Sequence, residues 1–464
     1  MKKKMYYVAL SALALVACTN DEVIDVNPGE AIDFAVTTGN VTRAETTTNT
    51  IDNFRVWAYQ TTPETTEPTS GTTTPAKDQA FFFEEEVTRA KSGDSWSAWS
   101  YGDTYFWPSS SGTLSSLSFY SISPANTYNA NMEGMKPAQT AISADKSFTY
   151  KVPAAIDGVP AGEDLLYAVN RVITKETYGG KVNVNFRHAL SQIVFKVKNT
   201  NPNLKVEVNA IDIVRTLNFG TYTLPKATTS PLTTTDTPVK GSWSNQSLLS
   251  EDEQTSDADI NYYGISKGGI SKEVTNSAGE TVEHLGDAVL TLEGVTAALS
   301  FEGVYGTGEN QVSHTALFMM PQTLTASTIT TATDGTKTMD LSSGTYFSIN
   351  CRISQKINRA WTHQWGDATN MNAAGTPCQR VAIPACTPDG YTWEEGKKYV
   401  YTIVFGEGAG YDGEPDDDDD DDDDTNQDPV LVPIDFTVTV DDFQDGGNYN
   451  VDMGSGQTTV ETTN

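Results

Sequence analysis

Apolar residues alternate with polar ones along much of this chain, which is the pattern of half-buried β-strands. The longest alternation lies near the C-terminal end and consists of Val430, Val432, Ile434, Phe436, Val438 and Val440. Apolar repeats of three or four residues, which would indicate helices, are much rarer, and Thr, Ser, Gly and Asn are abundant. The pattern therefore predicts an all-β protein with few helices.

The alternating pattern in the first half of the chain predicts a β-sandwich domain at residues 51–178. Its first strand, Ile51–Gln60, places Phe54, Val56 and Ala58 on one face and Arg55, Trp57 and Tyr59 on the other. Two further strands are expected at Phe81–Thr88 and Leu117–Ser123, at spacings that suit a sandwich. The Gly179–Gly180 pair marks the expected end of this domain.

The second half predicts another β-sandwich domain, at residues 179–447. Alternating strands at Val182–Phe186 and Ile193–Val197 flank a kink at His188–Leu190. Residues 225–310 are irregular, acidic and rich in Gly, so we expect an insertion there. A flexible, polar tail is expected at residues 448–464.

The N-terminus predicts export. Lys2, Lys3 and Lys4 precede an apolar run that is too short to span a bilayer, and residues 1–17 have the form of a signal peptide. The run ends in Leu-Val-Ala-Cys at residues 15–18, which resembles a bacterial lipobox. Cleavage would make Cys18 the first residue, and its lipid would give durable membrane attachment. An ordinary secreted protein, in which Cys18 is incidental, is the alternative.

A leader, residues 18–50, separates this cysteine from the body. Ile32, Phe34 and Val36 alternate with polar or small residues and predict one strand, which cannot stand alone. Arg43 and Ala44 follow in a polar, flexible stretch of the kind that proteases prefer.

The four letters Val-Thr-Arg-Ala at residues 41–44 recur at residues 87–90. The second copy directly follows an expected strand, so we interpret it as strand and turn and not as a cleavage site.

The charge balance excludes nucleic acid as a partner. Lys and Arg total 30 against 61 acidic residues, giving a net charge of −31, whereas a phosphate backbone requires a basic surface. An aspartate run lies within the expected loop 407–429, where mutual repulsion should extend a solvated loop. Weak calcium binding by Asp416, Asp418 and Asp420 is the alternative, although the EF-hand ligand spacing is absent.

Beyond the lipidated Cys18, three cysteines remain, and an odd number argues against a disulfide framework. Cys351 lies in an alternating run and is expected to be buried, while a bridge between Cys378 and Cys386 stays open.

The sequence predicts neither an enzyme nor a cofactor other than the lipid. The G-x-S-x-G pattern at Gly264–Gly268 falls in the irregular segment, without the strand and helix that a nucleophile elbow needs. The four histidines are scattered without zinc-ligand spacing, and His188, on the kink, is expected to be structural.

Several blocks in order along the chain resemble the fimbrillin (type V pilin, Mfa-like) family of Bacteroides-type bacteria. Besides the lipobox, they are Thr42–Ala44, Phe54–Tyr59, Tyr105–Pro108, Asp164–Ala168, Phe186–Ile193, Met320–Leu324 and Trp393–Tyr401. The resemblance implies two tandem transthyretin-like or Ig-like β-sandwich domains, the second with a long insertion. It also implies a lipoprotein on the outer membrane that assembles with other fimbrillin subunits into a surface fimbria, with adhesion to a host or bacterial partner.

The resemblance gives Arg43 a role. In polymerising members, an Arg-specific protease removes the leader after an arginine in this position, so here the cut would separate Arg43 from Ala44. The strand of Ile32, Phe34 and Val36 would leave with the leader, and a strand from a neighbouring subunit would replace it. The C-terminus departs from this pattern, because the residues after Val440 are polar and make a poor donor strand. Either Val430–Val440 is the donor, or the chain is a tip, an anchor or a permanently lipid-anchored member.

A glycan-binding surface lipoprotein is the competing interpretation. It would share the anchor and the sandwiches, and Trp96 with Trp99, or Trp361 with Trp365, could stack on sugar rings. Core packing or loop anchoring is the simpler role for each pair. Exposed, coplanar rings would favour glycan binding, whereas a leader strand packed in a groove would favour a fimbrial subunit.

Overall fold

A computed structural model gives the fold of the 464-residue chain. The structure describes residues 32–38, 51–62, 65–66, 73–74, 77–93, 95–108, 116–125, 146–152, 164–178, 181–225, 240–248, 262–267, 270–275, 281–285, 288–305, 312–333, 337–366, 378–406, 411–412, 426–427 and 435–442. The only helix in these ranges is a 3-10 turn, η1 (Lys175–Tyr178), and the rest of the regular structure is β. No helix in the described ranges has the length and apolar character needed to cross a membrane. The all-β prediction is confirmed.

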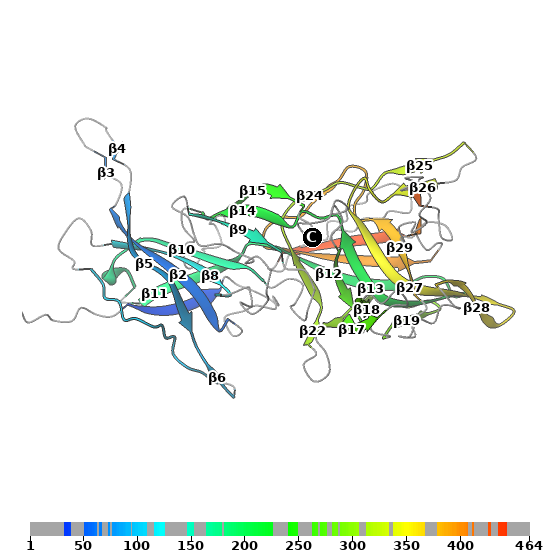
Figure 1. Ribbon diagram of the computed structural model, residues 1–464, viewed down its shortest axis with the longest axis horizontal. Helices are drawn as coiled ribbons and strands as arrows, with labels where there is room; N and C mark the ends of the chain where they lie inside the picture. The colour runs from blue at the N-terminus through cyan, green and yellow to red at the C-terminus, as the bar shows by residue number, and fades with distance from the viewer. Residues whose placement is uncertain are drawn as a thin grey trace, which may run out of the picture.

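A six-stranded sheet forms one end of the elongated molecule (Figure 1). In spatial order its strands are β1 (Asp33–Thr38), β11 (Lys181–His188), β10 (Leu166–Ile173), β8 (Ser116–Ser123), β2 (Asn53–Thr62) and β5 (Lys77–Thr88). β1 runs parallel to β11, and the other neighbours are antiparallel. β1 and β5 are therefore the two edges of this sheet.

The two faces of the six-stranded sheet bury separate sets of apolar side chains, because side chains alternate along a strand. On β2, Phe54, Val56 and Ala58 enter one core cluster, together with Ile32 and Phe34 of the leader. The intervening residues of β2, Trp57 and Tyr59, enter another. The sequence assigned these β2 residues to the same two faces.

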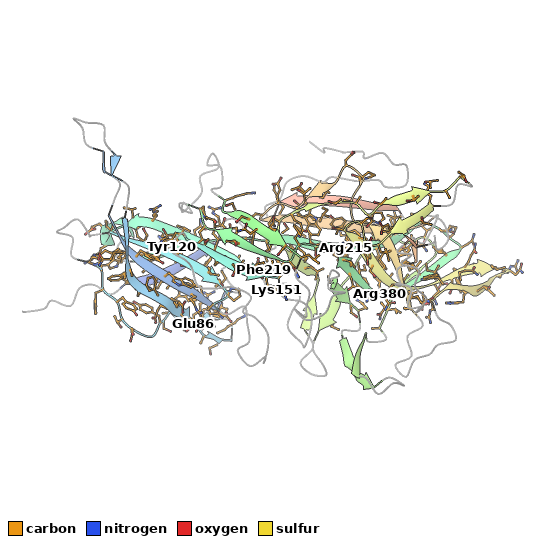
Figure 2. The ribbon with its side chains drawn as sticks, turned by 45° about the horizontal axis from the view of Figure 1, so that its top comes forward. Glu86, Tyr120, Lys151, Arg215, Phe219 and Arg380 are labelled. Atoms are coloured by element: carbon orange, nitrogen blue, oxygen red, sulfur yellow. The ribbon has the colours of Figure 1, made fainter. Side chains whose placement is uncertain are left out.

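A three-stranded sheet covers the Trp57 face. It consists of β9 (Ser147–Lys151), β14 (Phe219–Thr223) and β15 (Ser242–Ser247), with β14 in the middle. The rings of Tyr167 on β10 and Tyr222 on β14 lie 5.1 Å apart between the two sheets. Figure 2 shows Lys151 and Phe219, which are paired in this sheet, lying between Tyr120 of the first sheet and Arg380 of the distal part.

Two larger sheets pack face to face in the other half of the molecule. The five-stranded sheet contains β20 (Leu299–Ser300), β12 (Ser191–Asn199), β31 (Lys397–Phe405) and β34 (Asp435–Asp442) in order, with β23 (Ala316–Met319) also paired to β12. The seven-stranded sheet contains β16 (Tyr262–Ser266), β13 (Leu204–Val214), β27 (Tyr346–Ile357), β29 (Gln379–Pro384) and β32 (Tyr411–Asp412), with β19 (Leu290–Glu293) on β13 and β28 (Ala360–Trp365) on β27. Phe347 lies between them, 5.5 Å from Phe195 and 4.8 Å from Tyr401 between ring centroids.

The remaining described strands form small sheets around this frame. They are β3 (Thr65–Thr66) with β4 (Thr73–Thr74), β6 (Lys91–Ser92) with β7 (Ser95–Trp96), β17 (Ile270–Thr275) with β18 (Thr281–Leu285), β21 (Gly303–Tyr305) with β22 (Val312–His314), β24 (Thr323–Leu324) with β30 (Tyr391–Thr392), and β25 (Ile329–Thr331) with β26 (Lys337–Asp340) and β33 (Asn426–Gln427). The segment 225–310, where the sequence predicts an insertion, thus contributes β15 to the three-stranded sheet, β16 and β19 to the seven-stranded sheet, and β20 to the five-stranded sheet.

One continuous core cluster joins the two halves, since it runs from Trp57 on β2 to Phe347 on β27. The chain crosses between the halves at the kink that follows β11, where Ala189 N donates to Leu165 O at 2.8 Å. The domain limits stay a prediction: Gly179 and Gly180 lie outside the described residues, and β11, beyond them, pairs with β10 of the first sheet.

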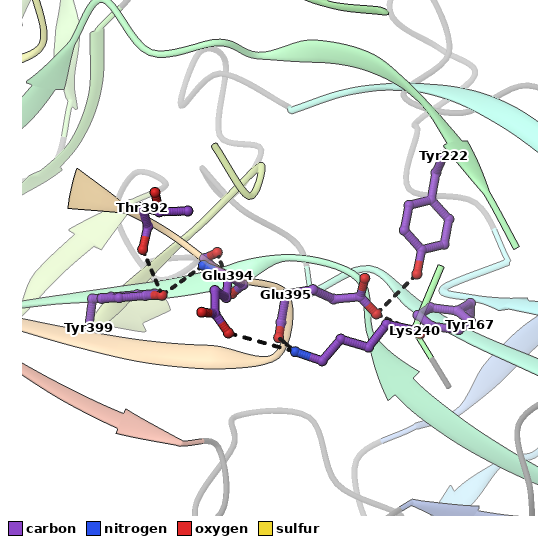
Figure 3. Close-up of polar contacts among 8 residues, drawn as sticks. Tyr167, Tyr222, Lys240, Thr392, Glu394, Glu395 and Tyr399 are labelled. Atoms are coloured by element: carbon purple, nitrogen blue, oxygen red, sulfur yellow. Dashed lines mark hydrogen bonds and ion pairs between the residues drawn. The ribbon is translucent and has the colours of Figure 1, made fainter. Parts of the chain in front are cut away.

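A polar cluster locks this junction (Figure 3). The partly buried carboxylate of Glu395 accepts hydrogen bonds from the hydroxyls of Tyr167, at 2.5 Å, and Tyr222, at 3.0 Å. Lys240 Nζ donates to the carbonyl of Glu395 at 3.2 Å and lies 3.9 Å from a carboxylate oxygen of Glu394. The cluster therefore joins β10 of the six-stranded sheet, β14 of the three-stranded sheet and the turn that precedes β31 of the five-stranded sheet.

Candidate assembly site

The leader strand β1 is part of the folded body. It pairs with β11 in register from Asp33 opposite Lys181 to Thr38 opposite Phe186. The side chains of Ile32 and Phe34 are only 2% and 3% exposed, and both belong to the core cluster on this face of the sheet. The backbone of Val36 pairs with Val184, while its side chain lies outside the described residues.

Phe34 occupies a pocket of aromatic rings. Its ring meets those of Phe54, Tyr101 and Phe119 edge to face, with centroid distances of 5.7, 5.6 and 6.0 Å. Edge-to-face contacts of this kind add to the free energy gained from burial. Burial of the Ile32 and Phe34 side chains alone should contribute roughly 3–6 kcal/mol.

A segment of irregular chain, Trp99–Trp107, closes the slot over β1, and we call it the strap. The amide of Ile32 donates to the carbonyl of Tyr105 at 2.9 Å, and the Tyr101 hydroxyl donates to the carbonyl of Ile32. The strap thus binds both polar groups of one residue at the start of the leader strand.

The strap is itself fastened to β5, at the opposite edge of the sheet. A carboxylate oxygen of Glu85 accepts hydrogen bonds from the amides of Gly102, at 2.8 Å, and Asp103, at 3.4 Å. The Tyr105 hydroxyl donates to the other oxygen at 3.4 Å, and its ring stacks on Phe82 at 4.3 Å. Burial, and then the Glu85 carboxylate, raise the pKa of Tyr105, so the hydroxyl stays protonated and can donate.

Of the two Val-Thr-Arg-Ala segments, the structure describes the second, while Arg43 and Ala44 of the first lie outside the described residues. Arg89, in the second segment, is held from several sides. Its backbone amide donates to Asp52 O at 2.9 Å, and its Nε donates to Ile51 O at 2.8 Å. Its guanidinium carbon lies 4.1 and 4.6 Å from the ring centroids of Trp96 and Trp99, and burial lowers its pKa although Asp52 opposes the shift.

The tryptophan pairs proposed for glycan stacking are engaged within the protein. The Arg89 guanidinium lies over both Trp96 and Trp99. Trp361 has Lys356 Nζ 5.4 Å from its ring centroid and donates to Glu293 at 3.3 Å, while Trp365 packs against the main core. Each pair thus has at least one ring that makes a polar or cation–π contact within the protein.

Other residues singled out in the sequence have mixed outcomes. Cys18, Asp416, Asp418 and Asp420 lie outside the described residues. The three described cysteines are free, so the bridge between Cys378 and Cys386 is not formed, and Cys351 is buried as expected. His188 is buried, with Nδ1 2.9 Å from Asp164 Oδ1, which is a structural pairing. The prediction that the G-x-S-x-G pattern lies in irregular chain is wrong, because Gly264–Ser266 lie in β16, at the edge of the seven-stranded sheet.

One relation escaped the sequence prediction, although the sequence carries its signal. The leader sequence Ile-Asp-Phe-Ala-Val-Thr-Thr, residues 32–38, recurs as Ile-Asp-Phe-Thr-Val-Thr-Val at residues 434–440, with five of the seven positions identical. Alternation requires only the apolar positions to match, yet Asp and Thr match as well. The second copy overlaps β34, which is an edge strand of the five-stranded sheet. A search for short internal repeats would have found it.

The fold and the site define an all-β protein whose first strand is a buried edge strand held by a strap. A family model described as fimbrillin-like matches residues 42–416, which is most of the chain. The chain therefore belongs to the fimbrillin-like family, whose members are structural proteins of cell-surface fimbriae and not enzymes.

Solved structures of fimbrial proteins are similar to the chain. A fimbrial protein from Bacteroides vulgatus has 17% identity and a TM-score of 0.43, over 81% of this chain and 95% of that one. The fimbrial anchor protein Mfa2 from Porphyromonas gingivalis has 10% identity and a TM-score of 0.23, over 81% of this chain and 90% of that one. No curated protein matches the chain.

Proposed function

We propose that this chain is a fimbrial subunit that is exported as a lipoprotein through Cys18 and anchored in the outer membrane. An Arg-specific protease then cuts after Arg43, and strand exchange joins the subunit to its neighbour. The observation that carries the proposal is the burial of Ile32 and Phe34, at 2% and 3% exposure, on a strand that ends before Arg43. Its loss leaves an apolar slot and an unpaired edge on β11, which a strand from another subunit can fill.

The strand that fills the slot is the segment Ile434–Val440 of a second copy of this chain. Its Phe436 and Val438 take the places of Phe34 and Val36, and its backbone takes over the pairing with β11. β34 is the last strand of its sheet, so only β31 has to release it. Among the alternatives for the C-terminus, the proposal therefore selects Val430–Val440 as the donor.

One slot and one donor strand in each chain determine the form of the assembly. The slot lies in the six-stranded sheet and the donor in the five-stranded sheet, so the two contacting surfaces differ. Contacts between unlike surfaces repeat head to tail, and where the rotation does not close a ring they give an open filament. This is the geometry of a fimbrial shaft.

The test uses the mature chain with Cys18→Ala, so that no lipid is attached, treated with an Arg-specific protease and followed by electron microscopy and size-exclusion chromatography. Cut wild-type protein should form filaments, Arg43→Ala should remain monomeric, and Phe436→Ala should be cut but assemble poorly. Phe443→Ala, an aromatic change just outside the repeat, is the matched control and should assemble normally. Filaments from protease-treated Arg43→Ala would overturn the role of the cut, and normal assembly of Phe436→Ala would overturn the choice of donor.

A further inference from the structure

We infer that the strap, Trp99–Trp107, is a latch that recognises the strand in the slot, so that cleavage after Arg43 does not by itself release the leader. The inference rests on the proposed strand exchange and assigns it a control point. The strap contacts the occupant at two features, the peptide groups of Ile32 and the ring of Phe34. Any strand that enters the slot must present both features to the same residues.

The backbone contact fixes the position of the occupant along the slot. Ile32 lies just before the first pair of β1 with β11, at the point where the occupant enters the ladder. The strap supplies partners for its amide and its carbonyl, the Tyr105 carbonyl and the Tyr101 hydroxyl. A strand displaced by one residue would present its other face to the core.

The ring contact selects the type of occupant. Tyr101 closes the Phe34 pocket from the strap side, and its ring is nearly parallel to that of Tyr105, at 8° and 6.1 Å. Tyr105 in turn stacks on Phe82 of β5 and bonds to Glu85. An occupant with a small side chain at position 34 would leave a cavity that these fastened rings cannot fill.

The fitting partner is therefore a strand with an aromatic residue two positions after the peptide that the strap binds. The Ile-Asp-Phe of residues 434–436 has this spacing, as does the leader itself. The six backbone pairs with β11 and the strap contacts should keep the cut leader in place until such a strand displaces it.

The latch is tested in the Phe436→Ala background, in which protein cut after Arg43 is expected to stay largely monomeric. The measurement is how fast an isotope-labelled synthetic peptide of residues 30–43 replaces the bound leader, with native mass spectrometry as the readout. Tyr101→Phe keeps the ring and loses only the hydroxyl, so exchange should be faster by about 3- to 10-fold, the effect of losing one hydrogen bond. Glu85→Gln weakens the hydrogen bonds that hold the strap to β5, so peptide exchange should also be faster in this variant. Tyr399→Phe, whose hydroxyl accepts from Glu394 N in the other half, is the control and should leave the rate unchanged.

Ring selection is tested with peptide variants in the same assay. A peptide with Phe34→Ala should bind roughly 100- to 4,000-fold more weakly than the natural one, since a buried Phe→Ala change costs about 3–5 kcal/mol. A peptide of residues 432–444 should compete with the leader.

Exchange in Tyr101→Phe at the wild-type rate, or an equal acceleration in Tyr399→Phe, would overturn the latch. Equal binding of the Phe34→Ala peptide would overturn ring selection. Because these measurements use single subunits, a failure to form filaments would count against the proposed function and leave the latch standing.

Discussion

The first and the last described strands of this protein have similar sequences but lie in different sheets and pair differently with their neighbours. β1 lies parallel to β11 at the edge of the six-stranded sheet, with six residues in register. β34 lies antiparallel to β31 at the edge of the five-stranded sheet, with eight residues in register from Asp435 to Asp442. The same Asp-Phe-x-Val-Thr sequence therefore lies in strands at two different sheet edges.

The difference bears on the proposed removal of the first strand. Parallel pairing is slightly weaker per residue than antiparallel pairing, and β1 is also the shorter of the two strands. The Ile32 and Phe34 side chains and the strap hold β1 in place. Under the proposed strand exchange, a leader held in this way is stable in the uncut subunit and can be replaced afterwards by a strand with the same pattern.

The largest effect is expected from Phe34→Ala. Removing this ring from its aromatic pocket should lower the free energy of unfolding of the first sheet by about 3–5 kcal/mol. Hydrogen exchange followed by mass spectrometry should show faster exchange in β1 and β11 and little change in β34. Phe436→Ala is the matched variant, and a comparable loss of protection at β1 in that variant would break the distinction between the two strands.

The junction is the next test, because it decides whether the two edges belong to one cooperative unit. Glu395→Ala leaves the buried hydroxyls of Tyr167 and Tyr222 without their shared acceptor. We expect a loss of about 2–3 kcal/mol and separate urea transitions for the two halves, whereas Glu395→Gln should lose less. A single transition with unchanged midpoint in Glu395→Ala would show that the core alone couples the halves.

The pH dependence of stability provides a second measurement at the same residue. Burial raises the pKa of the Glu395 carboxyl, against the opposing effects of the Tyr167 and Tyr222 hydroxyls, Lys240 and Arg187. The folded state therefore binds this proton more tightly than the unfolded state. The contribution to stability is complete below the unfolded pKa and is lost as the pH rises through the folded pKa. Urea midpoints of wild type and Glu395→Gln should diverge over that range, and parallel curves would contradict the assignment.

A smaller effect is expected from Ile32→Val, which removes one buried methyl group from the leader strand. The cost should be about 0.5–1.5 kcal/mol, seen as a lower urea midpoint for the first sheet. Ile434→Val should leave that midpoint unchanged in the uncut monomer. Equal shifts in both variants would mean that the repeat segments contribute to the same unfolding step.

The smallest change in free energy concerns Arg89. Trp96→Ala removes one of the two rings against its guanidinium and should cost about 0.5–1 kcal/mol. Limited digestion with an Arg-specific protease should then give a product cut after Arg89, which wild type lacks at the same enzyme concentration. Lys91→Ala, which also loses a contact with Trp96 but leaves Arg89 clamped, is the control. If Trp96→Ala, like wild type and Lys91→Ala, gave no product cut after Arg89, strand pairing alone would be enough to protect this site.

The sequence by itself determined the class of fold and the faces of individual strands. The period-two pattern of β2 correctly divided Phe54, Val56 and Ala58 from Trp57 and Tyr59, because side-chain alternation is a local property of an extended chain. The same pattern indicated that Ile32 and Phe34 would be buried once a partner was found. The repeat of the leader at residues 434–440 was also present in the sequence.

Only the tertiary structure decided which strands become neighbours. Local periodicity does not show that β14 and β15 cover the first sheet, that β1 runs parallel to β11, or that the strap reaches from Glu85 to Ile32. It also could not place Arg89 between two tryptophans. These contacts join residues far apart in sequence, and the shared core and the backbone pairing of the whole molecule select them.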